Sequence, residues 1–181
     1  MLLFRRIDET RWFDKEFLES ASVTELSTTD NELSVWINDG SVSELDIGLA
    51  YILTQRSFKS IWCVKIPDNA LSAKKLLLRQ QDSSTPFVAM RSYHTNILVP
   101  TVLELADLAE IIYELVKDHN ANCKFFTETE LKVHFYDTIV KDAIHIDFTS
   151  KINQAKWNTI KEMEKNLGPI DFSRLINVKP R

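Results

Sequence analysis

Histidine and acidic side chains cluster in the last third of the sequence, where they could hold a metal ion. His145 and Asp147 are two residues apart, which would place both on one face of a strand. His134 and Asp137 would share one face of a helix over 128–142. Imidazole and carboxylate together suit zinc, manganese or iron. The spacing matches no dedicated ligand motif such as H-E-x-x-H, so this metal site is an alternative, and the leading interpretation expects neither metal nor cofactor.

A second acidic pattern lies nearby. Asp118 and the triplet that begins with Glu130 and ends with Lys132 resemble the motif of restriction-type nucleases, in which acids hold a metal and lysine assists the attacking water. That chemistry requires Glu130 and Lys132 on one strand. However, Thr127-x-x-Glu130 is a capping box, and an apolar stripe continues to Ala143. We therefore expect a helix here and keep the metal-dependent nuclease as an alternative.

Other common active sites are excluded by composition. The chain of 181 residues has only three glycines, which rules out a P-loop, a dinucleotide-binding fingerprint and a glycine-rich kinase loop. No G-x-S-x-G nucleophile elbow occurs. The two cysteines, Cys63 and Cys123, form no C-x-x-C pair, and Cys63 lies in an apolar run typical of a buried strand. This usage favours a reducing compartment, and we expect the cytoplasm.

A basic segment over 74–94 is a candidate nucleic-acid contact. Cations there could bind phosphates while aromatic rings stack on bases. The residues are Lys74, Lys75, Arg79, Arg91, Tyr93 and His94. The competing interpretation is a solvated helix end and loop, because the whole chain has a net charge of −4 and fails the criterion of a strongly basic domain.

Charge alternates in sign along the chain. Residues 1–50 carry 4 basic and 11 acidic side chains, and residues 51–100 carry 7 and 2. Residues 101–150 carry 4 and 10, and residues 151–181 carry 7 and 3. Such blocks could pair inside the fold or present opposite charges to a partner, and internal pairing is the simpler interpretation.

The elements that must position these residues fall into two parts. The first hundred residues mix strands and helices. Alternation and apolar runs predict strands at 2–4, 32–37, 60–66, 87–90 and 97–99, and helical spacing predicts helices at 10–20, 42–55 and 68–75. A capping box, Ser41-x-x-Glu44, is expected to begin the second helix. Residues 79–86 are polar and read as a loop.

After Pro100 the pattern becomes helical. Thr101-x-x-Glu104 begins one expected helix and Thr127-x-x-Glu130 begins the next. A third apolar stripe over 152–167 stops at a Gly-Pro pair. The predicted fold class is therefore α+β, a small N-terminal sheet with flanking helices followed by a three-helix C-terminal half. We expect the halves 1–100 and 101–181 to pack as one unit.

The favoured function is a non-catalytic protein–protein interaction module, a small subunit or adapter of a larger intracellular assembly. No convergent catalytic set is visible, and the C-terminal tail carries apolar residues that could dock on a partner. These residues are Phe172, Leu175, Ile176 and Val178. We expect a protein partner or a homo-oligomer, with nucleic acid as an alternative partner. No run of about 18 apolar residues occurs, so we expect no membrane-spanning segment.

Overall fold

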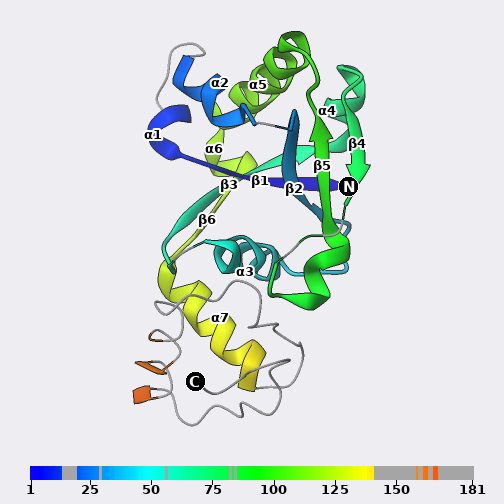
Figure 1. Ribbon diagram of the computed structural model, residues 1–181. Helices are drawn as coiled ribbons and strands as arrows, with labels where there is room; N and C mark the ends of the chain where they lie inside the picture. The colour runs from blue at the N-terminus through cyan, green and yellow to red at the C-terminus, as the bar shows by residue number, and fades with distance from the viewer. Residues whose placement is uncertain are drawn as a thin grey trace. The chain divides into compact units, whose positions relative to one another are not determined.

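A computed structural model shows two compact units (Figure 1). It describes residues 1–13, 20–28, 30–55, 57–81, 83, 85–140, 158, 161–162 and 165–166. The first unit comprises residues 1–42, 61–82 and 93–125, and the second comprises 43–60, 83–92 and 126–181. None of the helices among the described residues is long and apolar enough to cross a membrane.

A six-stranded sheet organises the first unit, in the order β4–β5–β2–β1–β3–β6 (Figure 1). The central strand β1 is antiparallel to both β2 and β3, and β5 is antiparallel to both β2 and β4. The bounds are β1 Leu2–Ile7, β2 Glu32–Asn38, β3 Ile61–Pro67, β4 Leu77–Gln80, β5 His94–Leu98 and β6 Cys123–Phe126. The strands β4 and β6 are therefore the two edges.

Side chains alternate in direction along each strand, so one set of apolar side chains lies on a common face of the sheet. Leu3 in β1 lies opposite Ile37 in β2 and Ile66 in β3, and residues directly opposite in antiparallel strands share a face. Leu33 and Val64 join the same core and are fully buried. Burying each such side chain stabilises the fold by about 1.5–3 kcal/mol relative to leaving it in water.

Helices of the first unit complete this core. α5 packs against β3 and against three other helices of the unit. The helices are α1 Glu9–Trp12, α2 Ser20–Leu26, α4 Asp68–Ala73, α5 Val102–Val116 and α6 His119–Asn122. The α5 helix begins at the expected capping box, in which the Thr101 backbone N–H donates to Glu104 Oε2 at 2.9 Å. The fully buried Leu108 and Ile112 face the core.

The second unit contains α3, Glu44–Thr54, which packs against α7, Glu128–Val140. It also holds most of a 3₁₀ turn, η1, Val88–Tyr93. Gly48 in α3 lets this packing become close, because a Cβ built there would lie 3.0 Å from Leu131 Cδ2 and from the Phe126 ring.

The predicted α+β class is confirmed, but the second half adds a strand that the sequence did not reveal. β6 follows α6 and joins the sheet beside β3. The two compact units interleave along the chain. That the halves 1–100 and 101–181 pack as one unit stays a prediction. Of the helix expected over 152–167, the described residues 158, 161–162 and 165–166 are helical.

The predicted capping box at Ser41 is wrong. The helix begins two residues later, where Ser43 is the N-cap and Asp46 completes the reciprocal hydrogen bonds. Ser41 is instead held in the preceding turn, because its backbone N–H donates to Asp39 Oδ1 at 2.9 Å. Gly40 in that turn has φ +95°, a conformation that L residues with side chains rarely adopt.

Three other predicted elements differ from the structure. Residues 88–93 form the 3₁₀ turn η1 instead of a strand over 87–90, and the Met90 N–H donates to the Phe87 carbonyl at 3.0 Å. The expected loop at 79–86 begins later, because β4 extends to Gln80 by pairing with β5. The expected helix at 10–20 is interrupted, since Phe13 has extended backbone angles and residues 14–19 lie outside the described part.

We predict that Gly48→Leu lowers the free energy of unfolding by about 1–3 kcal/mol, because the new side chain overpacks the α3–α7 contact. The measurement is urea unfolding followed by circular dichroism. Ala73→Leu, an exposed position in α4, is the control and should change the value little. Equal effects of the two substitutions would contradict this packing.

Candidate protein-interaction surface

The residues of the nuclease-like alternative cap helices. Asp118 is the N-cap of α6. Glu130 Oε2 accepts from the Thr127 N–H at 2.9 Å in the first turn of α7, and Lys132 pairs with Glu128 at 2.6 Å. Positions i and i+2 of a helix do not face each other, so Glu130 and Lys132 are not juxtaposed as the strand geometry requires. The predicted helix is confirmed, and the arrangement gives the nuclease-like alternative no support.

The metal alternative rests on residues that the structure describes only in part. His134 and Asp137 both lie on α7, while His145 and Asp147 fall outside the described residues. Within the described ranges, no group of three or more His, Cys, Asp or Glu could hold a metal ion. His134 Nε2 instead lies 2.7 Å from Asp46 Oδ1 in the second unit. The α7 residue is thus joined to the capping box of α3.

Asp46 is ionised in this arrangement. Its burial disfavours the carboxylate, but hydrogen bonds from His134 and Ser43 outweigh burial and hold the pKa of Asp46 below its usual value. The carboxylate therefore serves as an acceptor for a helix cap and for a histidine. Since Ser43 bonds the carboxylate and not the imidazole, the three residues do not form a nucleophile–base pair.

The two cysteines are buried and are not joined by a disulfide. Burial raises the pKa of the Cys123 thiol to about 12, so it is protonated at neutral pH. Cys63 is fully buried in β3, as the sequence predicts. Neither residue presents a thiolate nucleophile.

Two cations of the basic segment pair with acidic side chains of the first unit. Lys74 Nζ lies 3.1 Å from Asp107 Oδ1 and 2.7 Å from Glu110 Oε2 on α5. Arg79 on β4 pairs with Glu32 on β2. The positive block over 51–100 thus pairs with both neighbouring negative blocks, and internal pairing of the charge blocks is confirmed for these residues.

The remaining residues of that segment have separate local surroundings. Tyr93 is hydrogen bonded to Ser41, with 3.0 Å between the two side-chain oxygens. Arg91 belongs to the second unit, where its Nε donates to the Thr85 carbonyl at 2.9 Å. Lys75 is exposed. A duplex or single strand would therefore meet few uncompensated charges at this segment.

His94 is a buried core histidine. Its side chain lies on β5 with the ring 5.1 Å from that of Trp36, and its Nδ1 is 2.8 Å from the Gln81 carbonyl oxygen. Burial lowers the pKa of His94, and the hydrogen bond to Gln81 only partly opposes this shift. The neutral ring with the proton on Nδ1 satisfies that contact, so the residue is packed rather than presented for stacking on a base.

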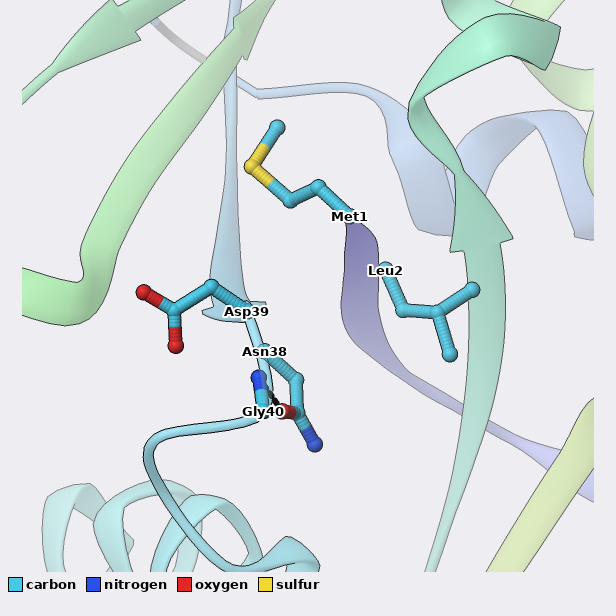
Figure 2. Close-up of a pocket in the computed structure, with 5 residues that line it drawn as sticks. All are labelled: Met1, Leu2, Asn38, Asp39 and Gly40. Atoms are coloured by element: carbon cyan, nitrogen blue, oxygen red, sulfur yellow. Dashed lines mark hydrogen bonds between the residues drawn. The ribbon is translucent and has the colours of Figure 1, made fainter.

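A pocket lies where β1 begins and β2 ends (Figure 2). It is lined by Met1, Leu2, Asn38, Asp39 and Gly40. Figure 2 shows Asn38 Oδ1 accepting from the Gly40 N–H, a contact of 2.8 Å. Hydrogen bonds from Ser41 hold the pKa of the exposed Asp39 below its usual value. The polar groups of this pocket therefore stabilise a turn.

Four exposed apolar side chains lie on the edge strand β4 and in the first turn of α5. Leu77 and Leu78 lie on β4 with exposed fractions of 65% and 37%, and Val102 and Leu103 in the first turn of α5 are 80% and 77% exposed. We call these four residues the β4–α5 surface.

Two observations place the parts of this surface at the same end of the first unit. Leu77 lies opposite Leu98, the last residue of β5, and α5 begins four residues after Leu98 (Figure 1). The ion pairs of Lys74 also hold the segment before β4 against α5. This surface is the strongest candidate for a functional site in the described part of the chain.

Sequence patterns contain a partial signal for this surface. Leu103 lies off the apolar stripe of α5 that includes Leu105, Leu108 and Ile112, so helical periodicity alone would leave it in solvent. Val102 is three residues before Leu105, so the same periodicity would assign it to the core. Leu77 gave no comparable signal, because β4 was not predicted. The tail residues Phe172, Leu175, Ile176 and Val178, proposed from the sequence as a partner-binding segment, lie outside the described residues.

Comparison with known proteins gave no match: no family model, curated protein or solved structure is significantly similar to the chain.

The burial of His94 predicts a pH dependence of stability. Its folded-state pKa lies below the unfolded value of about 6.5, so between the two values the unfolded chain binds more protons. The free energy of unfolding should therefore decrease as the pH falls below about 6.5. His94→Gln should show a smaller decrease in urea unfolding between pH 7.5 and 5.5. Identical pH profiles for the two proteins would contradict the prediction.

Proposed function

We propose that this protein is a non-catalytic protein–protein interaction module, a small subunit that binds a partner chain at the β4–α5 surface. The observation that carries the proposal is the exposure of Val102 and Leu103 at the same end of the first unit as the exposed leucines of the edge strand β4. Single exposed apolar residues are ordinary, but a group of them at one edge is typical of an interaction site.

Burial of these apolar side chains against a partner would favour binding. Each Å² of apolar area removed from water contributes about 25 cal/mol, so burial of several large side chains contributes a few kcal/mol to binding. Charged residues of both signs adjoin these elements: Lys75 precedes β4, and Glu104 lies in the first turn of α5. A mixed rim around an apolar centre is the usual arrangement of a protein interface.

The acidic, histidine and thiol groups described above form contacts that stabilise the fold, and this supports a non-catalytic role. Asp118 and Glu130 cap helices, and His94 packs against Trp36. The buried cysteines Cys63 and Cys123, which are not joined by a disulfide, support a reducing compartment such as the cytoplasm. The biological role of this protein would therefore depend on the partner that it binds.

The test is affinity purification of the tagged full chain from its native host, with mass spectrometry of the co-purifying chains, including an untagged copy of the chain itself. We predict a partner at near-stoichiometric yield for the wild type and at least a tenfold lower yield for the double variant Val102→Ser, Leu103→Ser. The two side chains are exposed, so folding should be preserved within about 0.5 kcal/mol.

Val133→Ser is the matched control, since Val133 is also an exposed apolar residue but lies on α7 in the second unit. It should retain the partner. A partner that both variants retain equally, or a chain that purifies without any partner, would contradict the proposed function.

A further inference from the structure

We propose that the β4–α5 surface binds a second copy of this chain, by antiparallel pairing of β4 with β4 of the partner copy and with Leu78 on the twofold axis. The inference rests on the proposed function, because it names the occupant of that same surface. It follows from the position of β4 in the sheet, from the order of its side chains and from the exposed residues on α5.

Among the strands that the structure describes, β4 is paired on one side only. In the sheet order it has β5 as a neighbour and stands at the end. Its four residues, Leu77–Gln80, are all exposed. The side of an edge strand that faces away from the sheet carries backbone N–H and C=O groups able to bind another strand. An added strand would continue the sheet beyond β4.

Side-chain direction restricts how two copies of β4 can pair. Leu78 lies opposite Ile97, which belongs to the buried core of the first unit, so Leu78 points to the face covered by helices. Leu77 and Arg79 point to the other face. A twofold axis perpendicular to the sheet places side chains of the same face directly opposite each other. Successive residues point to opposite faces, so they cannot be paired in this way. The axis must therefore lie beside one residue, which is then opposite its own copy.

Two such registers pair three residues of β4 from each copy. With the axis at Arg79, the two Arg79 side chains would lie directly opposite each other, and like charges in that position are destabilising. With the axis at Leu78, the two Leu78 side chains pack on each other and Leu77 lies opposite Arg79 of the second copy. Arg79 can keep its ion pair with Glu32 while its aliphatic stem covers the leucine.

The α5 residues enlarge this contact on the face to which Leu78 points. Val102 and Leu103 lie in the first turn of α5, just after β5. α5 packs on the same core that Ile97 enters, so its first turn lies on the Leu78 side of the sheet. Because the paired strand segment is short, we expect a reversible dimer with a dissociation constant of about micromolar order.

Cysteine substitution at the axis tests the register directly. Opposite residues of an antiparallel pair have Cα atoms about 4.5–5.5 Å apart, within the range of about 4.4–6.8 Å that a disulfide spans. Leu78→Cys should therefore form an intermolecular disulfide under mild oxidation. In Leu77→Cys the two new thiols are offset by two residues along the strands, so their Cα atoms lie beyond about 7 Å.

We expect at least tenfold more covalent dimer from Leu78→Cys than from Leu77→Cys, measured by non-reducing electrophoresis of the full chain. Both native cysteines are buried and should not contribute. Sedimentation velocity over a range of concentrations accompanies the test, and Leu78→Lys should shift the wild-type dimer to monomer, since two ammonium groups would meet at the axis.

The outcomes separate this inference from the proposed function. A wild-type dimer with selective crosslinking at position 78 supports the inference. A dimer that crosslinks equally at 77 and 78, or that persists in Leu78→Lys, overturns it. A monomeric chain that still captures a different protein through Val102 and Leu103 also overturns it and leaves the proposed function standing. A monomer that captures nothing contradicts both.

Discussion

The pairing of β1 with strands on both sides is the interaction on which the rest of the first unit depends. Leu3 and Phe4 are fully buried at its centre. The two neighbours of β1 are β2 and β3, and between these strands the chain leaves the sheet to form α3. It leaves again between β4 and β5, where η1 forms. The interleaving of the two units follows from this order, because the second unit is built mainly from segments that lie between or after the strands of the first.

The polar residues in the described part of the sheet unit act mainly within the fold. Lys74 holds the end of α4 to α5, Arg79 joins β4 to β2 through Glu32, and His94 fills the space beside Trp36. These charges are paired within the unit, and apolar side chains are exposed to solvent on β4. This division of roles explains how a chain with 27% charged residues can present an apolar surface.

Local features were predictable from the sequence. The capping boxes of Thr101 and Thr127 need only residues within one helical turn, and both form as predicted. The strands β4 and β6 were not predictable, because four-residue edge strands are defined by their partners rather than by their own periodicity. The misplaced start of α3 has a similar cause, since Asp39 competes for Ser41 in a turn that precedes the helix.

The candidate site was predictable only in part, for the same reason. The sequence identified residues with the right chemistry, such as Glu130, His134 and Arg79, but could not show that each is engaged by a neighbour in space. Contacts such as His134 with Asp46 join residues 88 positions apart. Apolar exposure is likewise a property of the folded chain, because Leu77 and Val102 resemble core residues until β4 and α5 are placed.

A partner bound at the β4–α5 surface must protect the backbone there, and hydrogen–deuterium exchange of the full chain, free and in its purified complex, measures that protection. We expect exchange to slow on complex formation in peptides covering Leu77–Gln80 and the first turn of α5, since the outward amides of β4 become hydrogen bonded. Protection confined to other segments, with β4 exchanging equally fast in both states, would contradict it.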